Sequence, residues 1–372
     1  MSQPPRERYQ EPFGRFFLPG PTEVRPEVLQ AQTRPMIGHR GRGIQQLMGR
    51  LQEGLKELFR TERPVFVSSS SATGLMEAAV RNGVRRRALA LVAGAFGERF
   101  AEIVEACGLE VERMVMPWGR PHDPEEVRQR LGDGGFDAVT VVHSETSTGL
   151  LQPLEEIARV TASHDDVLLL VDAVTSLAGA PVLTDRWALD FVLTGSQKAL
   201  AIPPGLALGV ASPTMMGRAA AAPAKGVYFD LVAFEENLKK LQTPNTPAVS
   251  LLHALDLQLQ RILEEGLEAR WDRHRAMAER CAGWVCHMRE ERDMEVDVLA
   301  PPGYRSPTVT CVRLPERVKG SDVVAALKQR GWTIGAGYGK MKDEAVRIGH
   351  MGDHTLEGLE ALLAALEEVL VP

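Results

Sequence analysis

The sequence contains Asp190-Phe191-Val192-Leu193-Thr194-Gly195-Ser196-Gln197-Lys198, an apolar run that leads into a tight loop carrying a lysine. A second apolar run, from Val167 to Val171, ends directly at Asp172. Runs of this length and composition predict buried strands of a parallel sheet. Because the carboxyl ends of such strands border the crevice in which α/β folds bind ligands, we expect Lys198 and Asp172 to face one site.

This lysine and aspartate together suit one cofactor. Burial lowers the pKa of a lysine, which favours the neutral amine that forms a Schiff base. An acid beside a pyridine ring keeps the ring nitrogen protonated and makes the ring an electron sink. The pair therefore predicts pyridoxal 5′-phosphate, held by Lys198 and Asp172. Taken alone, the same two residues could also be a surface lysine and an aspartate that caps a helix.

Strand and helix patterns alternate from about residue 44 to residue 211. Short apolar runs such as Val65–Val67, Ala88–Val92 and Ala138–Val142 are separated by segments with helical periodicity. This alternation predicts an α/β fold whose large domain is a mostly parallel sheet covered by helices. The 372-residue length leaves room for a second, smaller domain.

A different pattern follows Pro244-Asn245-Thr246-Pro247. A long helical stretch runs from Ala248 to about Glu264 and continues towards Val285, and an α+β region completes the chain. We predict a large domain over residues 19–260 and a small domain that contains residues 261–372. Residues 335–339, rich in glycine, are expected to form a loop beside Arg347. The helix that a nucleotide fingerprint requires does not follow them.

Several sequence motifs appear in the order typical of one enzyme family, and together they span residues 18–349. These segments are Leu18-Pro19-Gly20-Pro21-Thr22, Gly38-His39-Arg40, Ser68 to Glu77, His143 to Gly149, Val171 to Ser176, Gly195 to Leu200 and Val346-Arg347-Ile348-Gly349. With them the chain resembles the class V, fold-type I pyridoxal-phosphate aminotransferases, in particular the alanine–glyoxylate and serine–pyruvate branch. The N-terminal strand of this fold, here residues 11–18, usually joins the small domain, so the resemblance implies that residues 1–18 join residues 261–372.

The resemblance implies roles for further residues around the cofactor. Ser71, Ala72 and Thr73 open a helix after a strand, where backbone N–H groups bind phosphate, although the same loop could be an ordinary helix cap. By resemblance, the ring of Phe96 stacks on the pyridine and Val174 packs on its opposite face. Thr146 and Gln197 correspond to residues near the phenolic oxygen. Asn245 and Thr246 correspond to a segment that reaches the partner's cofactor phosphate in a homodimer with composite sites.

Substrate recognition is assigned to Gly20 and Arg347. An arginine within an apolar strand needs a partner, and its guanidinium binds a carboxylate with two hydrogen bonds. The resemblance makes Arg347 the receptor of the substrate's α-carboxylate. His39 and Arg40 lie near the Gly20 loop. The same pair occurs in several branches of the family that use different substrates, so it does not identify the substrate. Whether they bind a substrate side chain stays open.

The expected reaction is a ping-pong transamination from alanine or serine to glyoxylate or pyruvate. Phosphoserine and aspartate stay open as donors. A lyase of the cysteine desulfurase type would need a mobile cysteine, and Cys311 lies in a strand-like run instead. A cofactor-bound regulatory protein without turnover is a third possibility, against which the intact Lys198, Asp172 and Arg347 argue.

Composition narrows the class of protein further. A net charge of −6 with mixed signs does not suggest a nucleic-acid-binding surface. Residues 1–17 lack the apolar core of a signal peptide, and no apolar run spans a membrane. The four cysteines show no metal or disulfide spacing, so we expect no metal, buried inert thiols and a cytoplasmic enzyme.

Overall fold

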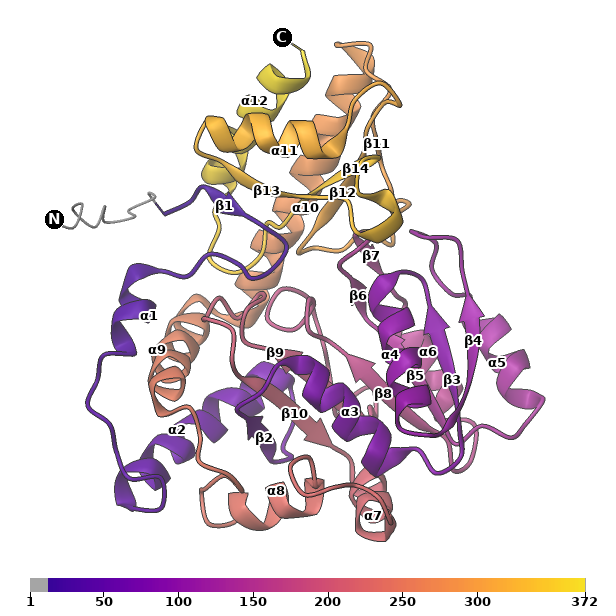
Figure 1. Cartoon of the computed structure of the whole chain (residues 1–372), viewed down its shortest axis with the longest axis vertical. Coiled ribbons are helices and arrows are strands. Elements are labelled where there is room, and N and C mark those ends of the chain that lie inside the picture. Colours follow the sequence, from indigo (N-terminus) through magenta and orange to yellow (C-terminus); the bar gives the residue numbers. More distant parts are fainter. Residues whose placement is uncertain (1–12, 372) are drawn as a thin grey trace, which may run out of the picture.

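The computed structural model describes residues 13–371. Its larger sheet contains seven strands in the order β2-β10-β9-β8-β5-β3-β4 (Figure 1). All neighbours from β9 to β4 pair in parallel, whereas β10 runs antiparallel to both β9 and β2. The predicted mostly parallel sheet is therefore confirmed. The strands are β2 (Val65–Ser68), β3 (Arg87–Val92), β4 (Glu110–Val115), β5 (Ala138–Val142), β8 (Leu168–Asp172), β9 (Phe191–Gly195) and β10 (Ala207–Ala211).

Helices pack against this sheet and complete the larger hydrophobic core. Helix α3 contacts β8, β9 and β10, and α4 contacts β3, β4 and β5. The interior strands are buried along their whole length except for Arg87 at the start of β3, which explains their largely apolar sequences. The helices of this part are α1 (Pro26–Ala31), α2 (Arg42–Phe59), α3 (Ala72–Gly83), α4 (Ala95–Ala106), α5 (Pro124–Gly132), α6 (Leu154–Thr161), α7 (Pro213–Ala221), α8 (Leu231–Leu238) and α9 (Val249–Glu265).

A second sheet of five strands, in the order β1-β13-β14-β12-β11, lies at the other end of the molecule (Figure 1). Strand β1 joins it by parallel pairing with β13, so the N-terminal segment belongs to this sheet as predicted. Residues 11 and 12 of the predicted strand lie outside the described residues. The elements here are β1 (Phe16–Phe17), β11 (Asp297–Val298), β12 (Thr310–Arg313), β13 (Thr333–Ala336), β14 (Ala345–Ile348), α10 (Leu267–Glu290), α11 (Gly320–Gln329), α12 (Leu356–Leu370) and the short 3₁₀ helix η1 (Gly339–Met341).

Two sequence predictions need correction in this region. The expected continuous helix after Ala248 breaks at Gly266, which has φ of +84° and separates α9 from α10. The expected loop over residues 335–339 begins inside a strand, because Gly335 and Ala336 pair with Arg347 and Val346 of β14. Gly335 has little strand propensity, so its pairing depends on the neighbouring strand.

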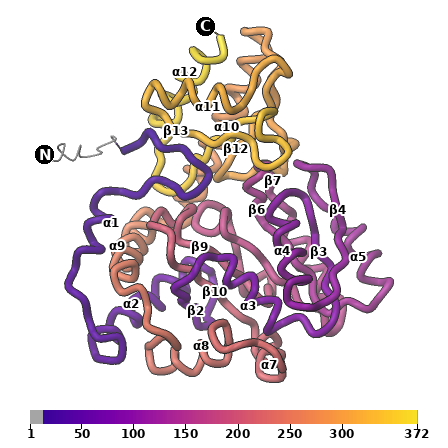
Figure 2. The backbone as a smooth tube through the Cα atoms, in the orientation of Figure 1, coloured from indigo at the N-terminus to yellow at the C-terminus, as the bar shows by residue number. Residues whose placement is uncertain are grey.

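The backbone trace shows how the parts are connected (Figure 2). Helix α10 leads from the side of the larger sheet to the side of the smaller sheet, and the chain passes beside β13 at β1 before it reaches α1. Buried side chains form one large cluster around the seven-stranded sheet and a second around α10, α11 and α12. The domain boundaries at residues 18 and 260 stay a prediction, which these two separate cores support.

Candidate active site

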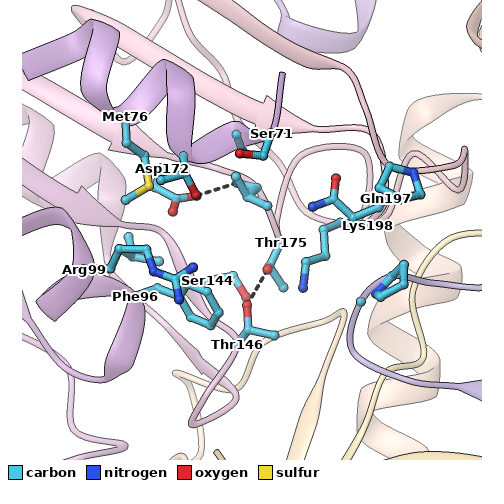
Figure 3. A pocket seen from close by; sticks show the side chains of 17 residues that line it. Ser71, Met76, Phe96, Arg99, Ser144, Thr146, Asp172, Thr175, Gln197 and Lys198 are labelled. Carbon is cyan, nitrogen blue, oxygen red and sulfur yellow. Dashed lines mark hydrogen bonds between the residues drawn. The ribbon is translucent and has the colours of Figure 1, made fainter. Parts of the chain in front are cut away.

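A cavity of about 250 Å³ lies at the carboxyl ends of the central strands of the larger sheet. Most of the residues predicted for a site line it, and Figure 3 shows several of their side chains pointing inward. Strand β8 supplies Asp172, and the loop after β9 supplies Lys198. The predicted residues in its lining are Gly20, Ser71, Ala72, Thr73, Phe96, Thr146, Asp172, Val174, Gln197 and Lys198.

Lys198 is almost completely buried, with 8% of its surface exposed. Its Nζ donates a hydrogen bond to the carbonyl of Pro19. Burial, together with the nearby positive charge of Arg347, lowers the pKa of Lys198 to about 8. A Cβ atom at Gly20 would overlap the Lys198 side chain, and Gly20 also has φ of +112°. Glycine at this position therefore leaves the space that the lysine occupies.

Asp172 is buried at 4% exposure, and its Oδ1 accepts a 2.8 Å hydrogen bond from the Val174 N–H. Burial raises the pKa of Asp172 to about 7. Within residues 13–371, no Lys, Arg or His side chain forms an ion pair with it. A buried carboxyl group that has no cationic partner is suited to pair with a cationic N–H donor that enters the cavity.

The N-terminus of α3 borders the same cavity. Ser71 is the N-cap residue of α3, yet its hydroxyl makes no capping hydrogen bond. Ala72 and Thr73 follow in the first turn and also line the cavity. The first N–H groups of a helix have no partner inside the helix, so this end of the cavity is suited to a phosphate.

Phe96 is held in place by a carboxylate that the sequence prediction did not use. Glu145 is buried, and its Oε2 accepts hydrogen bonds of 3.1 Å from the N–H groups of Phe96 and Gly97. Its Oε1 accepts from the N–H and Oγ of Ser147. Burial raises the pKa of Glu145. This network anchors the first turn of α4 and thereby the ring of Phe96.

Other cavity residues were missing from the sequence prediction, notably Arg99, Ser144 and Thr175. Arg99 lies one helical turn after Phe96, so the i, i+3 spacing on a helix could have revealed it. Its guanidinium carbon lies 4.9 Å from the centre of the Phe96 ring. The Thr175 hydroxyl is 2.5 Å from the hydroxyl of Thr146, a pair visible in Figure 3.

Arg347 lies beside the cavity and does not belong to its lining. On β14, its Nε donates to the carbonyl of Ala336 at 2.9 Å and its Nη1 to the carbonyl of Thr146 at 3.3 Å. Burial lowers the pKa of Arg347. Among residues 13–371, no acceptor takes a hydrogen bond from its Nη2. Nη2 is thus available to donate to a carboxylate.

Asn245 and Thr246 lie apart from the Lys198 cavity. They border a much smaller space together with Ser69 and Tyr228. Arg40 does not reach the Lys198 cavity either, because its guanidinium donates to Gln242 Oε1 at 3.2 Å and to the carbonyls of Thr243 and Pro244 at 2.6 and 2.9 Å. In a single chain Arg40 therefore holds the segment that carries Asn245.

The cysteines differ from one another more than predicted. Cys281 and Cys311 are buried, and burial raises the pKa of each thiol to about 12. Cys107 is only half-buried and Cys286 is exposed, so the expectation that all four are buried was wrong. Cys286 lies on the outer face of α10. The helical periodicity of this segment did not show which of its faces is exposed to solvent.

Among residues 13–371, no group of three or more His, Cys, Asp or Glu side chains is arranged to hold a metal ion. No helix in this part of the chain is both long and apolar enough to cross a membrane.

Comparison with known proteins gives consistent matches over nearly the whole chain. A family model described as aminotransferase class-V matches residues 27–353. An uncharacterised aminotransferase of Methanocaldococcus jannaschii is 39% identical, over 95% of this chain and 92% of the relative. A Synechococcus protein named as the small subunit of a soluble hydrogenase is 36% identical over the same shares. The crystal structure of an alanine–glyoxylate aminotransferase from Nostoc sp. is 31% identical, covers 100% of both chains and has a TM-score of 0.89.

Proposed function

Because the chain belongs to the class-V aminotransferase family, we propose that it is a pyridoxal-phosphate-dependent transaminase that moves the amino group of alanine or serine to glyoxylate or pyruvate. The observation that carries this proposal is the burial of Lys198 and Asp172 in one cavity at neighbouring strand ends. The alanine–glyoxylate activity named for the similar Nostoc enzyme supports the choice of substrates.

The cavity residues suit pyridoxal phosphate by their chemistry. Lys198 would carry the cofactor, and Asp172 would pair with its ring nitrogen. The open N-terminus of α3 at Ser71, Ala72 and Thr73 would hold the phosphate. When bound, the cofactor supplies an electron sink for the charge that develops at the substrate's α-carbon.

Further cavity residues would fix the plane of the ring. Phe96 and Val174 would hold its two faces. Thr146 and Gln197 would lie near its phenolic oxygen. These assignments follow the family pattern, and the presence of all four residues in the cavity lining supports them.

The chain's own residues would then perform the proton transfers. Lys198 has a lowered pKa, so its neutral amine can take the proton from the substrate's α-carbon and return it. Asp172 would keep a proton on the ring nitrogen. Arg347 would bind the α-carboxylate through its unoccupied Nη2 and orient both amino-acid and oxo-acid substrates. The two half-reactions alternate, which gives ping-pong kinetics.

Two alternatives have less support. Phosphoserine and aspartate stay possible donors, but Arg40 is engaged with residues 242–244 and does not reach the cavity. A desulfurase would need a mobile, reactive thiolate. Cys311 is buried within β12, with its pKa raised to about 12.

We further propose that the enzyme is a cytoplasmic homodimer with composite active sites. In a single chain Asn245 and Thr246 lie outside the Lys198 cavity, so they could complete such a site only from a second subunit. Mixing Lys198→Ala subunits with Asn245→Ala/Thr246→Ala subunits should restore activity that neither variant has. Failure to recover activity in mixed dimers would contradict the composite site.

A panel of single half-reactions tests the proposed function. Purified holoenzyme is mixed with one amino acid at a time, and the loss of the internal cofactor absorbance is followed together with the oxo acid formed. Alanine and serine should react faster than aspartate or phosphoserine, and glyoxylate or pyruvate should reverse the change. A faster reaction with phosphoserine than with alanine would contradict the proposed donors.

A further inference from the structure

Tyr338 connects three residues of the candidate site, although neither the sequence pattern nor the cavity lining singles it out. It lies between β13 and η1. Its phenol oxygen accepts a hydrogen bond of 3.3 Å from Nη2 of Arg99. Its ring centre is 5.5 Å from that of Phe96 and 5.3 Å from the guanidinium carbon of Arg347. The ring thus stands between the expected carboxylate receptor and the aromatic wall of the cavity.

The segment that carries Tyr338 is fixed at both ends. The Gly337 N–H donates to the carbonyl of Ala345 at 2.7 Å, and the Met341 N–H donates to the carbonyl of Tyr338 at 3.0 Å. A Cβ atom at Gly337 would overlap the carbonyl of Met341, so the turn requires glycine. The neighbouring Lys340 ammonium lies 4.6 Å from the centre of the Trp118 ring.

These contacts make Tyr338 a rigid wall. Its edge is held by Arg99, whose guanidinium in turn lies over Phe96, and its face is covered by Arg347. Among residues 13–371, Arg99 forms no ion pair with a carboxylate, and this phenol is its one hydrogen-bond acceptor. Because no salt bridge holds the Arg99 guanidinium elsewhere, its hydrogen bond can orient the Tyr338 ring.

We propose that Tyr338 determines specificity by limiting the length of the donor's side chain. This proposal rests on the proposed function. If the α-carboxylate of a substrate lies on Arg347 and its α-carbon faces Lys198, its side chain would approach the Tyr338 ring, whose centre is 5.3 Å from the Arg347 guanidinium carbon. Alanine and serine fit beside the ring, whereas each further methylene meets it. One methylene in such a pocket changes kcat/KM by about 10- to 200-fold.

The test compares alanine with 2-aminopentanoate, an unbranched donor two methylenes longer, on the holoenzyme. The wild type should favour alanine strongly. Tyr338→Ala should lower the ratio of kcat/KM for alanine to that for 2-aminopentanoate by about 10-fold or more. Tyr338→Phe keeps the ring and loses the contact with Arg99, so it should retain most of the wild-type ratio. Tyr304→Ala, which removes a partly exposed tyrosine outside the cavity, should leave the ratio unchanged.

The outcomes separate this proposal from the proposed function. If Tyr338 only held Arg347 in place, Tyr338→Ala would weaken both donors equally and the ratio would not move, which would overturn the proposal while transamination remained. A wild type that does not discriminate between the two donors would overturn it as well. A wild type that transaminates no amino acid would instead contradict the proposed function.

Discussion

At the scale of single residues, burial brings the pKa values of Lys198 and Asp172 close together. The lysine falls to about 8 and the aspartate rises to about 7, in each case mainly because burial disfavours the charged form. Near neutral pH, each group can therefore lose or gain a proton at a small cost in free energy. This property suits groups that transfer or hold protons during catalysis.

The lowered pKa of Lys198 predicts how the cofactor attaches to the cofactor-free protein. Only the neutral amine attacks an aldehyde. The fraction of Lys198 in this neutral form rises with pH and approaches its maximum above the pKa. The rate of attachment of pyridoxal phosphate should increase up to pH of about 8 and level off above it. Stopped-flow absorbance, with circular dichroism to confirm folding at each pH, measures this. A rate that still climbs at pH 10 would indicate an ordinary lysine.

Replacing the acid separates cofactor binding from turnover. Asp172→Asn should still bind pyridoxal phosphate, because Lys198 and the α3 N-terminus remain, but its amide cannot stabilise a protonated ring nitrogen. We expect kcat to fall on the order of 100-fold or more. Steady-state kinetics on the cofactor-loaded variant give the answer. A folded, loaded variant with near-normal kcat would show that Asp172 has another role.

Local sequence predicted these two residues because Asp172 ends the buried strand β8 and Lys198 lies in the loop directly after the buried strand β9. The function of Glu145 was not visible in the same way. A buried acid reveals its role only through its partners, here the N–H groups of Phe96 and Gly97, which are about 50 positions away in the chain. Tyr338 was missed for the same reason, since its contacts come from α4 and β14.

At the scale of elements, strand and helix alternation predicted the larger sheet well, because fully buried parallel strands have continuous apolar sequences. The smaller sheet was less accessible to prediction. Strand β13 is short and contains Gly335, so its conformation depends on pairing with β14 and β1. The break at Gly266 could have been expected, since a glycine inside a helical pattern commonly ends a helix.

The break between α9 and α10 gives a stability prediction. Gly266 has φ of +84°, which a side chain rarely adopts, although nothing lies within 4 Å of a Cβ atom there. Gly266→Ala should therefore lower the free energy of unfolding by about 1–3 kcal/mol through backbone strain alone. Chemical denaturation of the variant measures this change.

Gly283 is the matched control for that experiment. It lies inside α10, and a Cβ atom there also meets nothing within 4 Å. Because its backbone is helical, Gly283→Ala should raise the free energy of unfolding by up to about 1 kcal/mol. Equal effects of the two substitutions would show that the conformation of Gly266 is not strained for other residues.

At the scale of the whole molecule, a buried ion network connects the active-site loop with α9, α10 and the segment after β14. Arg270 is 1% exposed, and both its Nη atoms donate to Asp353 Oδ1 at 3.1 Å. Its Nη2 also donates to the carbonyl of Ala199, next to Lys198, at 2.8 Å. Gln258 of α9 donates to the same carboxylate. Sequence alone did not predict this network, since its members are far apart in the chain.

Removing Arg270 should therefore destabilise the whole protein. Arg270→Ala leaves Asp353 buried with fewer partners, and we expect the free energy of unfolding to fall by about 3–5 kcal/mol. Arg275→Ala, which breaks an exposed ion pair with Asp272 on the same helix, should cost less than about 1 kcal/mol. Denaturation curves of both variants give the comparison, and similar losses would refute a special role for the network.

Chemical trapping tests most directly whether Lys198 is the residue that carries pyridoxal phosphate. Purified holoenzyme is reduced with borohydride, digested and mapped by mass spectrometry. We predict a single pyridoxyl-modified peptide with the label on Lys198, and no label when Lys198→Ala is treated in the same way. A label on any other lysine, or an unmodified Lys198 in cofactor-loaded protein, would contradict the claim.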